Sequence, residues 1–300
     1  MVTNRQTSGI EESRVAVPSG NGPMARRLLL GSQLRRLRES KEISREEAGY
    51  HIRASESKIS RLELGRVSFK SRDVEDLLTF YGVTDAAERE RVLALAREAN
   101  QKGWWQPYID VLPEWFQRYI GLEESASIIR SYELQFIPGL LQTEEYARAV
   151  LSGRPGVPRN VIDARVAVRM KRQTLLDRPN PPRLWVVIDE GVLRRPTGGH
   201  RIARAQIKHL AELTDQPWLT VQVLPFEVGF HVADSGAFSI LRFPDPGLAD
   251  IVYLERLTGA IYLEKREEVG EYMFAMDQLG LRSSSPEKTA DVLRTVAAAL

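Results

Sequence analysis

The sequence contains no cysteine, and this absence removes several kinds of chemistry at once. Without thiols, the chain forms no disulfide, no thiolate zinc site and no cysteine nucleophile. No stretch approaches the roughly 18 consecutive apolar residues that a membrane span requires. The first residues also lack the basic start and apolar core of a secretory signal, so we expect a cytoplasmic protein without a membrane partner.

Net charge is also small, at +2 for the whole chain, but it is unevenly distributed. Residues 31–72 hold eleven Lys and Arg against six Asp and Glu, an excess of five positive charges, so the remainder carries −3. A basic segment joined to a mildly acidic remainder is typical of a nucleic-acid-binding domain fused to another domain. A solvated helical surface gives a similar composition, so the local motifs must decide between the two.

Composition divides the chain near residue 100. Residues 1–24 are polar, rich in Gly, Ser and Asn, and lack periodicity, so we predict a disordered tail. Residues 25–100 are predicted to form consecutive short helices with brief breaks. Residues 101–300 hold all five tryptophans and fourteen of the sixteen prolines, and we predict that they form a second, larger domain.

Two adjacent helix starts dominate the first domain. Ser44, followed three residues later by Glu47, forms a capping-box pattern, and Ser55 is a suitable N-cap for the next helix. Within that next helix Ile59 and Leu62 lie three residues apart, so they share one face and point to a core. Two short helices joined by a tight turn form a helix-turn-helix layout, whose second helix exposes Glu56, Ser57, Ser60 and Arg61.

The stretch "LRRLRESKEISREEAGYHIRASESKISRLELGR" resembles the XRE family of helix-turn-helix regulators, the lambda and 434 repressor type. The resemblance covers about residues 31–80 and is most specific in "SESKISRLELGR". It implies an all-α, lambda-repressor-like bundle with a recognition helix over residues 55–64 in the major groove of double-stranded DNA. The base-reading residues would be Glu56, Ser57 and Arg61, to which the exposed helix face adds Ser60. The phosphate-binding residues would be Ser44, Arg45, Lys58 and Arg66, together with the cap residue Ser55, and Arg38 would form a structural ion pair with Glu63.

The side-chain chemistry is compatible with these roles. Arg61 can donate two parallel hydrogen bonds to O6 and N7 of guanine, and Glu56 can accept one from N4 of cytosine. Glu56 has an alternative role, because an acid in the first helical turn also stabilises the helix dipole. Lys58 is better suited to a phosphate contact, which adds affinity without sequence information.

The first domain also departs from the family pattern at two turns. Glu42 and Arg53 stand where the family usually has glycine. A left-handed backbone there would cost a non-glycine residue roughly 1–2 kcal/mol. Because Ala48 and Gly49 also replace larger residues, we expect a module of moderate stability with a thin core.

The second domain is predicted to be an α+β domain with a helical front. Residues 104–151 alternate aromatic and aliphatic side chains with proline breaks and predict helices, one of them capped by Thr143. Another amphipathic helix is predicted over "NVIDARVAVRMKRQTLL". Five strands, interleaved with further helices, are predicted at "RLWVVID", "LTVQVLP", "AFSILRFP", "DIVYLER" and "GAIYLEK".

The second domain carries a resemblance of its own, in "IPGLLQTEEYA", "ARVAVRMKRQTLL", "VIDEGVLRRPTGG", "VQVLPFEVGFH" and "VYLER". Over about residues 104–280 it is similar to the C-terminal region of a group of actinobacterial XRE regulators described as antitoxin-like. That resemblance implies a transcription factor, often encoded beside a small protein with which it is thought to work.

Catalytic and metal-binding motifs are missing from the sequence. The four histidines show no HExxH or similar spacing, and no G-x-S-x-G, P-loop or G-x-G-x-x-G occurs. We expect the adjacent Asp189 and Glu190 to cap the short helix that follows rather than to act as an acid/base pair. The aromatic residues between 104 and 119 could line a ligand pocket, but such stripes are more often core. We therefore expect no enzymatic activity, no cofactor and no metal.

The sequence therefore predicts a sequence-specific DNA-binding transcriptional regulator, associated with the nucleoid in the cytoplasm. We expect a homodimer on an inverted repeat, with the second domain used for sensing, dimerisation or partner binding. One alternative is an antitoxin-like protein that mainly binds a small partner and uses DNA binding for autoregulation. Another is a ligand-processing enzyme with a DNA-binding appendage, which turnover of a small molecule by residues 101–300 would favour.

Overall fold

The first domain is a bundle of α-helices in the computed structural model, which describes residues 22–233 and 235–300. Most of the predicted tail, residues 1–21, lies outside these described residues, and Pro23 and Met24 already belong to the first helix. The helices are α1 (Pro23–Ser40), α2 (Arg45–His51), α3 (Glu56–Glu63), α4 (Ser71–Phe80) and α5 (Ala86–Ala99). Their inward faces share one core, which includes Leu30, Leu34, Ala48, Ile59, Leu62, Leu77 and Leu78, and Phe69 joins it from the segment between α3 and α4.

The helix starts predicted for α2 and α3 are confirmed. The Ser44 hydroxyl accepts a hydrogen bond from the Glu47 amide at 3.1 Å, and the Glu47 carboxylate accepts one from the Ser44 amide at 2.7 Å. This return bond also lowers the pKa of Glu47. The Ser55 hydroxyl caps α3 by accepting from the Lys58 amide at 3.2 Å. Each cap satisfies backbone donors that an uncapped helix would leave unpaired, and so fixes where the helix begins.

The two turns that lack the expected glycine do adopt a left-handed backbone. Glu42 has φ 57° and Arg53 has φ 55°, and these are the only positive-φ residues other than glycine in the described chain. The turn before α2 and the turn between α2 and α3 therefore keep the geometry of the helix-turn-helix despite the unfavourable residues. Gly49, by contrast, has no room for a side chain, because a Cβ there would lie 2.8 Å from the Ala54 carbonyl oxygen. The small residue is needed for close packing of α2 on the turn, which corrects our interpretation of Gly49 as a thinning of the core.

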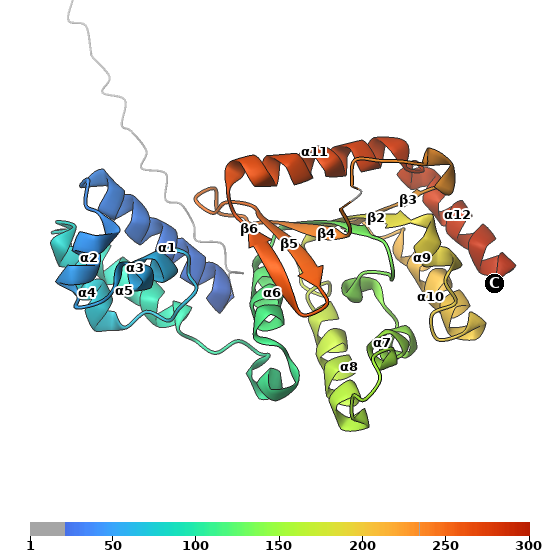
Figure 1. The fold of residues 1–300 in the computed structure, drawn as a ribbon, viewed down its shortest axis with the longest axis horizontal. Helices are drawn as coiled ribbons and strands as arrows, with labels where there is room; N and C mark the ends of the chain where they lie inside the picture. The colour runs from blue at the N-terminus through green and yellow to red at the C-terminus, as the bar shows by residue number, and fades with distance from the viewer. Residues whose placement is uncertain (1–21, 234) are drawn as a thin grey trace, which may run out of the picture.

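The second domain is built on a six-stranded mixed sheet in the order β3-β2-β1-β4-β5-β6 (Figure 1). The strands are β1 (Ile128–Glu133), β2 (Arg183–Asp189), β3 (Leu219–Leu224), β4 (Phe238–Arg242), β5 (Ile251–Arg256) and β6 (Gly259–Leu263). β1, β2 and β3 pair in parallel, whereas β4, β5 and β6 pair antiparallel from the other side of β1. The α+β fold class predicted from the sequence is confirmed.

Helices cover both faces of this sheet. One face packs against α11 (Arg266–Arg282) through a cluster that includes Tyr132, Val187, Val252 and Met276. The opposite face forms the largest core among the described residues, together with helices α6, α7, α9, α10 and α12. Their bounds are α6 (Glu114–Ser125), α7 (Glu144–Ser152), α9 (Glu190–Arg194), α10 (His200–Leu213) and α12 (Pro286–Ala299). Helix α8 (Arg159–Gln173) packs on α7 and on the short 3-10 helices η1 (Gln106–Val111) and η2 (Gly139–Leu141), and a third, η3 (Phe226–Val228), follows β3.

The helical front is interrupted at residues 128–133, which form β1 in the middle of the sheet, a strand that the sequence analysis did not predict. The five strands predicted from the sequence are all present as β2 to β6. β1 was missed because its six residues directly follow α6 and alternate only weakly, with Arg130 and Glu133 interrupting the apolar positions. Its strand conformation depends on pairing with β2 and β4, which are distant in the sequence.

Helix α1 contributes to the cores of both domains. Leu30 and Leu34, in its middle, belong to the core of the bundle, whereas Leu28 and Met24 pack against the core of the second domain. α1 approaches α6 closely at Gly121, where a Cβ would lie 2.8 Å from the Met24 Cβ. The two domains are therefore joined by a shared helix as well as by the chain between α5 and η1.

Candidate nucleic-acid interface

The outward face of α3 carries the residues expected to read bases. Glu56, Ser57 and Arg61 are exposed, and Ser60 is half-buried. On the opposite face Ile59 and Leu62 are fully buried, which fixes the orientation of the helix. The Arg61 Nε donates to the backbone oxygen of Ser57 at 3.3 Å, so the guanidinium lies along its own helix.

A buried acid fixes α3 to the rest of the bundle. The Glu63 side chain is only 2% exposed and accepts from the Arg38 Nε at 2.5 Å and from the Arg38 Nη2 at 3.1 Å. Arg38 also donates to the backbone oxygen of Ile43 at 2.7 Å, which connects α1 to the turn before α2. The hydrogen bonds that Arg38 donates to the Glu63 carboxylate raise the pKa of Arg38. The structure therefore pairs Arg38 with Glu63, as predicted from the family resemblance. Removing either partner would leave the other as a buried charge without a counter-ion.

Two of the expected phosphate-binding side chains are engaged in internal ion pairs. Arg45 donates from Nε to the Oε2 of Glu63 at 3.0 Å, so it joins the Arg38 pair. Lys58 contacts the Oδ2 of Asp73 on α4 at 2.5 Å. Neither side chain is completely buried, so a DNA phosphate could contact either one. To do so, the Lys58 ammonium would have to contact the phosphate and Asp73 together, or leave Asp73 for the phosphate.

Ser44 and Ser55 mark the N-termini of α2 and α3, where the first backbone amides point out of each helix. Both hydroxyl oxygens accept capping bonds, which leaves the hydroxyl hydrogens available as donors. Both side chains are exposed. Helix N-termini with free amides and positive dipole ends favour bound anions, so these two positions suit DNA phosphates.

Arg66, the last expected phosphate contact, faces the second domain. Its Nη2 lies 3.5 Å from Oε1 of Glu264, just after β6, and the same oxygen accepts from Arg118 of α6 at 2.7 Å. The Arg118 guanidinium in turn sits over the Tyr262 ring, 4.2 Å from its centroid. Glu264 therefore links an exposed arginine of the bundle to the larger domain, a contact that no local sequence pattern indicated.

Both domains of the chain match models of known protein families. Residues 29–92 match the model of a helix-turn-helix domain. Residues 116–295, well over half of the chain, match a family described as a domain of unknown function, DUF5753. The chain belongs to the DUF5753 family. No curated protein and no solved structure matches it.

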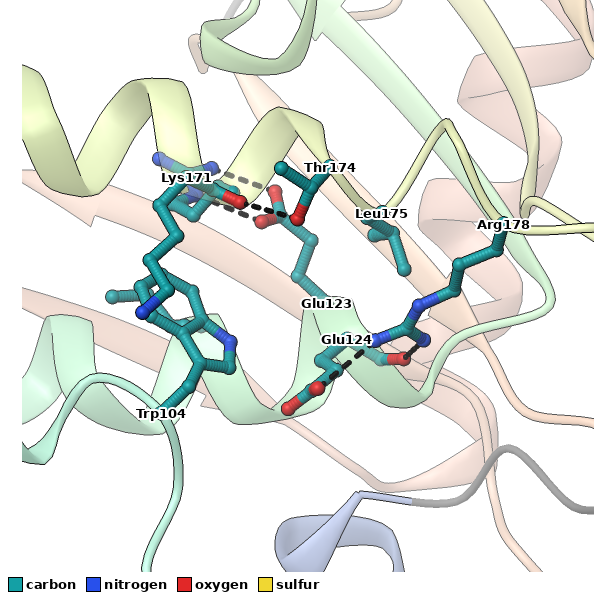
Figure 2. A pocket seen from close by; sticks show the side chains of 9 residues that line it. Trp104, Glu123, Glu124, Lys171, Thr174, Leu175 and Arg178 are labelled. Carbon is teal, nitrogen blue, oxygen red and sulfur yellow. Dashed lines mark hydrogen bonds and ion pairs between the residues drawn. The ribbon is translucent and has the colours of Figure 1, made fainter.

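A small cavity lies in the DUF5753 domain between α6 and α8 (Figure 2). Its volume of about 60 Å³ has room for a few water molecules rather than for an organic ligand. Glu124 pairs with Arg178 at 2.9 Å, but its Oε2 atom is buried and accepts no hydrogen bond among the described residues, and burial raises the pKa of this carboxyl. Lys171 and Trp104 also line the cavity, and the Lys171 ammonium lies 5.2 Å from the centroid of the Trp104 ring. The small volume and the unpaired Glu124 oxygen together suit a cavity that holds ordered water molecules.

The wall of this cavity holds an ion pair that sequence analysis missed. The Arg172 guanidinium donates to both Glu123 oxygens, at 2.8 and 2.6 Å, and both side chains are almost fully buried. Arg172 also lies against the rings of Phe116 and Tyr119. Burial disfavours the charged guanidinium and so acts to lower the pKa of Arg172. The charge and hydrogen bonds of the Glu123 carboxylate together have the larger effect, so the pKa of Arg172 is raised. The only sequence signal was a basic residue on the apolar stripe of α8.

Other residues weighed as catalytic candidates have structural contacts in the DUF5753 domain. Asp189 caps α9 by accepting from the Gly191 amide at 2.8 Å, as predicted. Glu190 accepts from Arg194 at 2.8 Å and from the Phe226 amide at 3.1 Å. In the described part of the chain no three His, Cys, Asp or Glu residues are grouped to hold a metal ion. Nor does any helix there combine the length and apolarity needed to cross a membrane.

Proposed function

We propose that this protein is a sequence-specific DNA-binding transcriptional regulator that inserts the N-terminal end of α3 into the major groove. The observation that carries the proposal is the division of α3 into two faces. Glu56, Ser57 and Arg61 point outward without ion-pair partners in the described chain, while Glu63 is buried between Arg38 and Arg45. A helix held rigidly on one side and bearing free polar tips on the other suits base reading.

Arg61 is the residue expected to contribute most to specificity. Within the described residues its guanidinium makes one hydrogen bond, to the Ser57 carbonyl at 3.3 Å. A guanine edge can replace this weak bond with two charge-assisted hydrogen bonds. Phosphate contacts from Ser44, Ser55 and the amides of α2 and α3 would set the orientation without reading sequence. Lys58 would add affinity, reduced by the need to share its charge with Asp73.

We infer that the functional unit is a homodimer on an inverted repeat, because one short helix contacts too few base pairs to select a genomic site. The DUF5753 domain would supply dimerisation, sensing or partner binding, with no catalytic step, in a cytoplasmic protein. Its likeness to actinobacterial XRE regulators described as antitoxin-like supports a small protein partner as the alternative main function. Exposed apolar side chains favour a protein contact of this kind. Phe230 and Leu281 are 80% and 79% exposed, and Arg282 beside Leu281 donates to the Phe230 carbonyl at 3.2 Å.

The test measures binding of full-length protein to duplexes that wild type selects from a random library. Arg61→Ala should relax one base position per half-site by about 1–3 kcal/mol, because a bidentate base contact is lost. Lys58→Ala should weaken binding to all sequences alike and reduce the slope of log affinity against log salt by about 0.9. Arg159→Ala, which removes an exposed charge from α8, is the matched control and should change neither. An unchanged sequence preference in Arg61→Ala would show that the reading surface is wrongly assigned.

A further inference from the structure

The six-stranded sheet ends in two edge strands with different surroundings, β3 on one side and β6 on the other (Figure 1). The outer side of β3 is closed by the segment between α11 and α12. There the Ser284 amide donates to the Val223 carbonyl at 2.8 Å, and the Ser284 hydroxyl accepts from the Val223 amide at 3.0 Å. The Thr289 hydroxyl donates to the Val221 carbonyl at 2.8 Å. These bonds use the outward backbone groups of β3, so another strand cannot pair at these positions.

The edge formed by β6 is open. The strand pairs with β5 in a one-to-one register that begins at Arg256 and Gly259, on either side of a two-residue turn. In such a hairpin the pair next to the turn exchanges hydrogen bonds, and the direction of bonding alternates along the strand. Gly259 and Ile261 therefore bond to β5, whereas the amides and carbonyls of Ala260 and Tyr262 point away from the sheet. Within the described residues, no backbone group outside β5 bonds to β6.

β6 also lacks the features that normally protect a sheet edge. Its sequence, "GAIYL", contains no charged residue and no proline, and the one-to-one pairing with β5 leaves no bulge. Edge strands usually carry at least one of these devices, because open backbone groups pair readily with another chain. The strand is held firmly, since the Tyr262 hydroxyl donates to the Trp115 carbonyl of α6 at 2.6 Å. A fixed, uncharged strand with open backbone groups is suited to pairing with a further strand.

We propose that β6 pairs antiparallel with β6 of a second copy of this chain, about a two-fold axis at Ile261, and so forms the homodimer. The choice of a second copy rests on the proposed function, which requires a dimer. In this register Ala260 lies opposite Tyr262 of the second copy, and each such pair exchanges two backbone hydrogen bonds. A shift by one residue would set these groups opposite residues that bond to β5. A shift by two would halve the number of bonds made within β6.

Charge and symmetry both fit a second copy. Self-pairing of β6 sets no like charges opposite each other, and Ile261 meets Ile261 at the axis as an apolar, β-branched pair. Glu264, directly after the strand, is already paired with Arg118 at 2.7 Å. Leu257, in the turn before β6, is 78% exposed at the end of the same edge and would gain apolar contacts. Because the β3 edges are closed, the joined sheet cannot extend further, and assembly stops at a dimer.

The test measures the mass of the full-length protein by sedimentation at micromolar concentrations, without DNA. Wild type should be a dimer. Ile261→Lys and Ile261→Glu each place two like charges about 5 Å apart at the axis, so each should raise the dimer dissociation constant at least tenfold. An equal mixture of the two variants should form dimers again, because a lysine then meets a glutamate. Thr220→Lys, at a half-buried position on the closed edge strand β3, is the matched control and should remain a dimer.

The proposal is overturned if wild type is a monomer, if either Ile261 variant dimerises as wild type does, or if the mixture stays monomeric. A wild type that dimerises only after removal of residues 1–21 would assign the edge to the chain's own N-terminal segment and would equally overturn it. If the Ile261 variants fail to fold, Ala260→Pro provides the test, because it deletes an outward amide without affecting the bonds to β5. Dimerisation that persists in Ala260→Pro would overturn the proposal. A wild-type dimer that selects no DNA sequence would contradict the proposed function and not the β6 contact.

Discussion

Glu42 and Arg53 allow a direct test of backbone strain, because both are non-glycine residues in a left-handed conformation. Both side chains are exposed, and neither makes a hydrogen bond or an ion pair with another described residue. Replacing either residue with glycine therefore removes strain without deleting a contact. The change gains the left-handed penalty of about 1–2 kcal/mol and loses about 0.5–1 kcal/mol to the greater freedom of glycine in the unfolded chain. Each variant should be about 0.5–1 kcal/mol more stable, and the double variant about 1–2 kcal/mol more stable because the two turns share no partner.

The assay is denaturant unfolding of the full chain, followed by far-ultraviolet circular dichroism and by hydrogen exchange of amides in residues 23–100. All five tryptophans lie beyond residue 103, so their fluorescence reports the second domain and serves as an internal reference. Lys41→Gly is the matched control, because Lys41 precedes Glu42 and has φ −104°. It should lose about 0.5–1 kcal/mol of stability through the entropy term alone. If Glu42→Gly is destabilised as much as Lys41→Gly, the strain argument is refuted.

Three further substitutions test separate features. Arg172→Met leaves the Glu123 carboxylate buried without a partner and should lower the unfolding free energy in urea by about 3–5 kcal/mol. Lys171→Met, at an exposed position on the same helix, should lower it little, and equal losses in the two variants would contradict a stabilising role of the buried ion pair. Gly49→Ala places a Cβ 2.8 Å from a turn carbonyl and should cost about 1–3 kcal/mol of stability, so an unchanged melting temperature would show that the turn can relax freely. The pKa of Glu133 is raised from 4.5 to about 8 in the folded protein, so wild type should lose stability as the pH rises through that range, by at most about 1.4 kcal/mol per unit and by less because the side chain is partly solvated. Glu133→Gln lacks this loss, so the difference in unfolding free energy between Glu133→Gln and wild type should grow in favour of the variant between about pH 4.5 and pH 8 and level off above that range. A difference that stays constant over this range would contradict the raised pKa of Glu133.

The parts of the fold that the sequence predicted are those governed by local interactions. The caps at Ser44 and Ser55 act within three residues, and the buried pair Ile59 and Leu62 follows from helical spacing. Strands β2 to β6 carried enough β-branched and aromatic residues to be recognised individually. β1 was not recognised, because its conformation depends on strands that lie more than fifty residues away on one side and more than one hundred on the other.

The candidate site shows the same division. Exposure of Glu56, Ser57 and Arg61 follows from the helical period, and the Arg38–Glu63 pair was expected from a family resemblance. The ion pairs of Lys58 with Asp73 and of Arg66 with Glu264 join residues that no local pattern connects.

The measurement that most directly tests the proposed function is selection of random-sequence duplexes by purified full-length protein, carried out in parallel with wild type and Arg61→Ala near physiological salt. Wild type should enrich an inverted repeat whose half-site centres lie about 34–36 Å apart, or a multiple of that distance. Arg61→Ala should enrich the same repeat with one base position per half-site no longer specified. Failure of wild type to enrich any sequence, or an identical motif from both proteins, would contradict the proposal that α3 reads DNA through its outward face.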